Sequence, residues 1–217
     1  MPPQPDISSL PFDTDIEAAV ERLSRSPAPE FALPANRFHK AKAADKANRR
    51  GIKNFIRPEN AAAVIANLPE PGGRTHCLLR GDFVLCDIIP QIIAARGRCE
   101  HLRIATLGMS VANADTLACL VERGHVGKLT LLVSLYFAQV DKTTVFRAVT
   151  SRLHGIARPA VTRNHAKVIC LPTSSGDAYV VEGSANLRSS DNVEQMLITN
   201  DGETHAFHAA WIDELAA

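Results

Sequence analysis

The 217-residue sequence has no apolar run long enough to cross a bilayer, which argues against a membrane-spanning anchor. Its first residues also lack the basic start and apolar core of an export signal, so we expect a cytoplasmic protein without stable membrane association. Aromatic residues make up only 5% of the chain, which argues against extensive stacking of bases on a single strand.

No C-x-x-C pair is present, and the cysteines are scattered through apolar surroundings, so we expect reduced core residues. Most of the histidines lie in separate segments. His205 and His208 are three residues apart, but no carboxylate or cysteine completes a metal-ligating set around them. We therefore expect neither a metal nor another cofactor. The five cysteines are Cys77, Cys86, Cys99, Cys119 and Cys170.

The net charge of +1 hides an uneven distribution along the chain. Residues 1–35 are rich in proline and acidic side chains and are expected to form a flexible leader. Residues 36–75 are expected to form a basic helical segment whose charge can follow a phosphate backbone. A solvated amphipathic helix explains the same charges equally well. The candidate nucleic-acid-binding residues are Lys46, Arg49, Arg50 and Lys53.

From residue 76 onward the sequence alternates between apolar strands and amphipathic helices. Strands are expected near 78–85, 101–107 and 128–134, and helices over 88–95, 112–122 and 143–153. A β-hairpin and a final helix through Trp211 follow. This alternation predicts an α/β domain over 76–217, with a mixed, largely parallel central sheet flanked by helices.

The hairpin carries the residues with the clearest chemistry. His165 and Lys167 are two apart, so on a strand both side chains leave the same face and a nucleophile or base stands beside a positive charge. Ser184 and Asn186, in the segment Gly-Ser-Ala-Asn, offer a hydroxyl and a carboxamide that can hold an oxyanion. Glu194 supplies a carboxylate that can orient an imidazole.

Together these residues resemble the H-x-K…G-S-x-N…E signature of the phospholipase D superfamily, whose members break phosphodiester bonds through a phosphohistidine. The resemblance covers residues 76–217 and implies the fold of one phospholipase D-like repeat. It assigns catalytic roles to His165, Lys167, Asn186 and Glu194, and a hydrogen-bonding role to Ser184. Because such enzymes use two histidines and this sequence has one repeat, the resemblance also implies a homodimer with a composite site.

One position departs from the family pattern. The family has an aspartate five residues after the lysine, and Pro172 stands there in this chain. Asp177 is a candidate substitute at a different spacing. The departure leaves open a catalytically degenerate protein that binds nucleic acid without cutting it.

The motif indicates the type of bond more clearly than the substrate. The basic stretch and the absence of a membrane segment favour a metal-independent endonuclease acting on DNA or RNA, similar to the small dimeric nucleases of the superfamily. A phospholipid phosphodiesterase is a further alternative. It is less favoured because no interfacial helix with a strong apolar face is evident.

Overall fold

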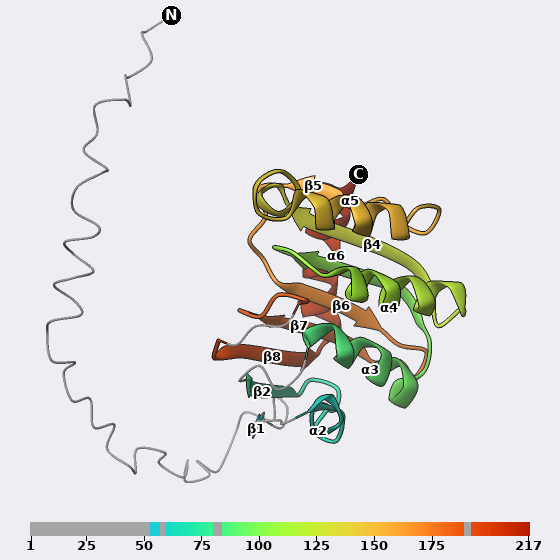
Figure 1. Cartoon of the computed structure of the whole chain (residues 1–217). Helices are drawn as coiled ribbons and strands as arrows, with labels where there is room; N and C mark the ends of the chain where they lie inside the picture. The colour runs from blue at the N-terminus through green and yellow to red at the C-terminus, as the bar shows by residue number, and fades with distance from the viewer. Residues whose placement is uncertain (1–52, 57–59, 80–83, 189–191) are drawn as a thin grey trace, which may run out of the picture. The chain divides into compact units, whose positions relative to one another are not determined.

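Eight strands of the described chain form one mixed β-sheet (Figure 1). The computed structural model describes residues 53–56, 60–79, 84–188 and 192–217. The spatial order is β1-β2-β8-β7-β6-β3-β4-β5. The strands are β1 (Lys53–Ile56), β2 (Arg74–Leu79), β3 (Cys99–Thr106), β4 (Val126–Ser134), β5 (Ala160–Thr162), β6 (Val168–Pro172), β7 (Ala178–Gly183) and β8 (Glu194–Asn200).

Six of these eight strands run in one direction, and β6 and β8 run against them. Parallel neighbours are therefore found at the two ends of the sheet, in β1-β2 and in β3-β4-β5. The reversal arises because β6, β7 and β8, which follow one another along the chain, pair as antiparallel neighbours. The expected mixed sheet with mostly parallel strands is confirmed.

Helices cover both faces of the sheet (Figure 1). On one face α6 (Gly202–Ala216) buries Ile212 against a small apolar cluster that includes Ala105, Leu132 and Val180. The larger core lies on the other face, where it includes Ile104, Ile169 and Val181. The helical elements on that side are α2 (Ala61–Ile65), the 3-10 turn η2 (Leu85–Asp87), α3 (Ile88–Arg96), α4 (Val111–Glu122), the π-helix η3 (Phe137–Asp141) and α5 (Thr143–Arg152).

Side-chain caps fix where two of these helices begin. Ser110 and Asn113 form a capping box at the start of α4, with Ser110 Oγ 3.2 Å from the Asn113 amide nitrogen. Asp201 caps α6 by accepting a hydrogen bond of 2.7 Å from the Thr204 amide. Ser110 thus has a structural role at the start of α4, in the loop that follows β3.

The expected helices over 88–95, 112–122 and 143–153 and the final helix are confirmed to within two residues at most ends. The strands expected at 101–107 and 128–134 are confirmed as β3 and β4. The boundary expected at residue 76 falls inside β2 and is wrong for that reason. Residues 53–75 are not a wholly helical segment, because β1 pairs in parallel with β2 and extends the sheet. The pattern was missed because a four-residue strand is too short to show an alternation.

The expectation of buried, reduced cysteines is also confirmed. Cys77, Cys86, Cys99 and Cys170 are free and buried, and the partly buried Cys119 is free as well. Burial raises the pKa of the four buried thiols to about 12, so each stays protonated and unreactive at neutral pH.

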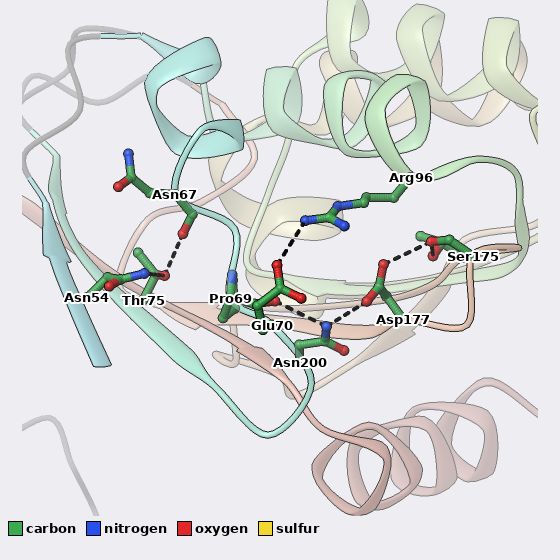
Figure 2. Close-up of polar contacts among 10 residues, drawn as sticks. Asn54, Asn67, Pro69, Glu70, Thr75, Arg96, Ser175, Asp177 and Asn200 are labelled. Atoms are coloured by element: carbon green, nitrogen blue, oxygen red, sulfur yellow. Dashed lines mark hydrogen bonds and ion pairs between the residues drawn. The ribbon is translucent and has the colours of Figure 1, made fainter. Parts of the chain in front are cut away.

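A buried polar network joins the β6-β7 turn to the end of β8 (Figure 2). The Asp177 carboxylate accepts hydrogen bonds from Asn200 Nδ2 at 2.7 Å and from Ser175 Oγ at 2.9 Å. Asn200 also donates to the Pro69 carbonyl at 3.1 Å and accepts from the Ala178 amide at 3.0 Å. Since both Asp177 and Asn200 are buried, each depends on the other for its polar partners.

We expect Asn200→Ala to lower the free energy of unfolding by about 2–4 kcal/mol, because it leaves a buried carboxylate without its strongest donor. Urea denaturation measures this loss. Thr116→Ala is the matched control, since it removes an exposed bond to the Ala112 carbonyl and should change stability by less than about 0.5 kcal/mol. Equal losses in the two variants would contradict a structural role for the network.

Candidate active site

The strand directions bring the motif residues to one edge of the sheet. The carboxyl ends of β3, β4 and β7 lie at this edge together with the amino ends of β6 and β8, because β6 and β8 are reversed. The register pairs Val168 with Glu182 and Gly183 with Met196. The segments 163–167 and 183–186 and the start of β8 therefore meet where α/β sheets usually bind ligands.

His165 and Lys167 lie just before β6, in an irregular segment, so the prediction that both are on a strand is wrong. Asn164 holds this segment: its Oδ1 accepts from the Ala166 amide at 2.8 Å and its Nδ2 donates to the Thr106 carbonyl at 3.3 Å. These side-chain bonds replace the strand ladder until Gly183 donates to the Lys167 carbonyl at 3.3 Å.

The two side chains nevertheless meet. Lys167 Nζ lies 2.9 Å from His165 Nδ1 and donates to the His165 carbonyl at 2.7 Å. An ammonium group can only donate, so His165 Nδ1 accepts and a neutral His165 ring carries its proton on Nε2. His165 is exposed, and Nε2 is the ring nitrogen that Lys167 leaves for other partners.

Two opposing effects act on the Lys167 ammonium. Partial burial lowers its pKa, and the negative charge of Glu194 acts in the opposite direction with a smaller effect. The net result is a pKa below the ordinary lysine value, which makes this ammonium a better proton donor than an exposed lysine.

Ser184 fixes the Glu194 carboxylate. Ser184 Oγ donates to Glu194 Oε2 and accepts from the Gln195 amide at 3.0 Å, while the Ser184 amide donates to the Gln195 carbonyl at 3.0 Å. These bonds continue the β7-β8 pairing past Gly183 and orient the carboxylate at the site edge. The bond expected between Glu194 and His165 stays a prediction.

Asn186 has a buried side-chain oxygen, and no donor from the described part of the chain lies within hydrogen-bond distance of it. Its neighbours Ala185 and Leu187 are buried and anchor this turn in the core. An unpartnered buried acceptor is destabilising by about 1–3 kcal/mol, so such groups usually serve a ligand or a partner molecule.

Pro172 and Asp177 lie far from these groups. Pro172 ends β6, and Asp177 lies in the turn beyond it, so the length of the strand separates them from the His165 edge. The buried hydrogen bonds of Asp177 show an architectural role for the residue that the sequence offered as a substitute for the missing family aspartate.

The four candidate nucleic-acid-binding residues are not brought to this edge by the described structure. Lys46, Arg49 and Arg50 lie outside the described residues. Lys53 begins β1, and its backbone pairs with Arg74 at the start of β2, which is the end of that strand away from the site. Their part in binding stays a prediction.

One feature of the site was missed in the sequence. A cavity of about 620 Å³ lies beside His165 and is lined by Tyr136, Gln139, Val140 and Arg163, among others. The signal was present as a Leu-Tyr-Phe run directly after the strand expected at 128–134.

Within the described ranges, no group of three or more histidine, cysteine or acidic side chains could hold a metal ion. A search of the same ranges for a helix both long and apolar enough to span a bilayer also found none.

No family model matches the chain, and no curated protein matches it. Among solved structures it is similar to NucT from Helicobacter pylori, with a TM-score of 0.44 and 16% identity over 65% of this chain and 95% of that chain. It is also similar to Nuc from Salmonella typhimurium, a phospholipase D family member, with a TM-score of 0.44 and 14% identity over 58% and 84% of the two chains.

A third similar structure is TrmBL2, an archaeal chromatin protein, with a TM-score of 0.39 and 14% identity over 64% of this chain and 50% of that chain. The resemblance to the phospholipase D superfamily rests on the motif residues of this chain. The identities and TM-scores are too low to transfer an activity, so the function below is based on the residues of this chain.

We expect the Lys167 ammonium to titrate at a lower pH in the folded protein than in urea, because burial disfavours its charged form. Glu194→Gln should lower that midpoint further, since it removes the opposing negative charge. The stability contribution of this lysine therefore rises with pH between its folded and unfolded pKa values. NMR of the lysine side chain measures both midpoints, and an unchanged midpoint in Glu194→Gln would contradict the contact.

Proposed function

We propose that this chain is a metal-independent phosphodiesterase, an endonuclease that acts through a phosphohistidine at a homodimer interface. The observation that carries the proposal is the 2.9 Å contact between Lys167 Nζ and His165 Nδ1 at the ligand-binding edge of the sheet. This contact places a cation beside an exposed imidazole, which is what attack on an anionic phosphodiester requires.

In the first step, His165 Nε2 attacks phosphorus and the bond from phosphorus to the leaving oxygen breaks. Nε2 must be unprotonated for this attack, so Lys167 has to leave Nδ1 and the ring proton has to move from Nε2 to Nδ1 by exchange with water. The negative charge of the bound phosphodiester attracts the Lys167 ammonium and draws it away from Nδ1. Glu194, held by Ser184, then accepts a hydrogen bond from Nδ1–H and stabilises the positive charge that the ring gains on attack.

A second proton donor is needed for the leaving oxygen. The partner subunit's His165 supplies it as imidazolium and becomes the neutral base that activates water. Water then attacks phosphorus, its proton returns to the partner subunit's His165, and the phosphorus–nitrogen bond breaks. The unpartnered Asn186 Oδ1 supports this arrangement, since a dimer interface or a bound substrate can provide its missing donor.

The architectural role of Asp177 bears on the degenerate alternative. Pro172 removes the family aspartate, but Asp177 supplies a buried carboxylate that joins the same hairpin to the neighbouring strand. Asp177 therefore supports the turn of the hairpin although Pro172 replaces the family aspartate. The charged and polar groups of the site edge are those that a catalytic protein needs.

We expect the protein to cleave labelled single- or double-stranded DNA or RNA in the presence of EDTA. His165→Ala should reduce the rate by about 10³-fold or more, because it removes both the nucleophile and the proton donor. His154→Ala is the matched control, since His154 is also exposed but lies beyond the end of α5, and its rate should be unchanged.

Each other outcome identifies an alternative. A degenerate nucleic-acid-binding protein would bind nucleic acid tightly without cleaving it, both as the natural chain and as His165→Ala. Its binding would be lost when Lys46, Arg49 and Arg50 are neutralised. Turnover of phospholipid headgroup analogues without cleavage of nucleic acid would show a lipid phosphodiesterase.

Mixing subunits tests the composite site. When equal amounts of the natural chain and His165→Ala are unfolded and refolded together, only dimers with two intact histidines should be active, so activity falls to about one quarter of that of the same total amount of natural protein. A value near one half would contradict the shared site, because each subunit would then act alone. Gel filtration of both proteins confirms that the variant still dimerises.

A further inference from the structure

The cavity beside His165 is formed by three parts of the chain. The segment after β4 contributes Tyr136, Gln139 and Val140, the segment before β6 contributes Arg163 and His165, and Leu107 follows β3. The lining is therefore continuous with the proposed nucleophile. A phosphodiester bound at His165 has its neighbouring chemical group within reach of this cavity.

The exposed apolar side chains of the cavity stand on a rigid base. Phe137 is fully buried, and its ring packs edge to face against Phe146 with centroids 5.8 Å apart. A β-carbon on Gly108 would lie 3.0 Å from the Phe137 ring, so the loop after β3 approaches this ring closely. Phe137 thereby anchors the π-helix η3, a rare conformation that is frequent at functional sites.

This anchor leaves two neighbouring apolar side chains in solvent. Tyr136 is 52% exposed and Val140 is 67% exposed, although both flank the buried Phe137. The Tyr136 amide donates to Ser134 Oγ at 3.2 Å, which holds the residue where β4 ends. Exposed apolar side chains on a fixed backbone beside a reactive group mark a binding surface.

From this geometry we infer that the cavity is a nucleobase subsite, which takes the base of a nucleotide whose phosphate lies at His165. This inference rests on the proposed function. Tyr136 offers a ring for stacking, and Arg163 and Gln139 offer polar groups for the base edge or the adjoining phosphate. The cavity lining is mostly apolar, which suits the face of a flat aromatic ring, and the guanidinium and carboxamide give its polar edge a partner.

The subsite has a consequence for the substrate. A base can enter the cavity only when it leaves its stack, so unpaired nucleotides are preferred over a regular duplex. A single exposed ring holds one base and not a run of them, which agrees with the low aromatic content of the chain.

The test compares a thymidine dinucleotide with two analogues, in each of which one base is replaced by hydrogen. The cavity holds one base, so only the analogue that lacks this base should be cleaved more slowly. The natural chain should cleave the full dinucleotide with a kcat/KM about tenfold above that of this analogue, because one stacked base is lost. Tyr136→Ala should lose this preference, so that its kcat/KM for the full dinucleotide is about equal to its kcat/KM for the same analogue. Tyr136→Phe should keep the preference, and so should Phe207→Ala, which removes an exposed ring on α6.

Equal cleavage of all three compounds by the natural chain, or an unchanged preference in Tyr136→Ala, would overturn the inference. If the natural chain cleaves none of them, the assay on labelled DNA and RNA decides the proposed function separately, and binding of thymidine monophosphate is compared with that of deoxyribose phosphate by NMR. Tighter nucleotide binding that Tyr136→Ala abolishes still supports the subsite, and equal binding overturns it. Turnover of a short-chain phospholipid that depends on Tyr136 would assign the cavity to an acyl chain and overturn the base assignment.

Discussion

The reversed direction of β6 and β8 is the constraint on which the site depends. In a wholly parallel sheet, residues that precede a strand lie at the edge opposite to residues that follow one. Here the segment before β6, the segment after β7 and the start of β8 meet at the edge where β3 and β4 end. His165, Lys167, Ser184 and Glu194 are brought together by this hairpin topology and not by closeness in sequence.

The two edges of the sheet have separate roles. At the turn beyond β6, Asp177 and Asn200 satisfy each other in the interior, and their hydrogen bonds join the hairpin to β8. At the other edge, His165 is exposed, Asn186 Oδ1 is unpartnered and burial destabilises the Lys167 ammonium. Stability gained at the first edge supports polar groups at the second that would otherwise favour unfolding.

Much of the fold follows from the sequence because its helices and central strands have long periodic patterns. Strand β1 was missed since four residues carry no pattern, and the domain boundary moved with it. The candidate site residues were chosen by their spacing, and the geometry that joins His165 to Lys167 comes from Asn164, whose two hydrogen bonds depend on the tertiary fold. The cavity at Tyr136 was missed because an aromatic residue after a strand usually packs inward, and only the buried Phe137 shows why Tyr136 does not.

The central claim is a covalent bond between His165 and the substrate phosphorus. The most direct measurement is rapid alkaline quenching of the protein during turnover of an oligonucleotide, followed by mass spectrometry of the peptide that contains residues 163–171. The account predicts that the phosphate-bearing fragment of the cleaved oligonucleotide is attached to His165 and that this adduct disappears as product forms. Cleavage at full rate without any adduct, together with undiminished activity in His165→Ala, would contradict it.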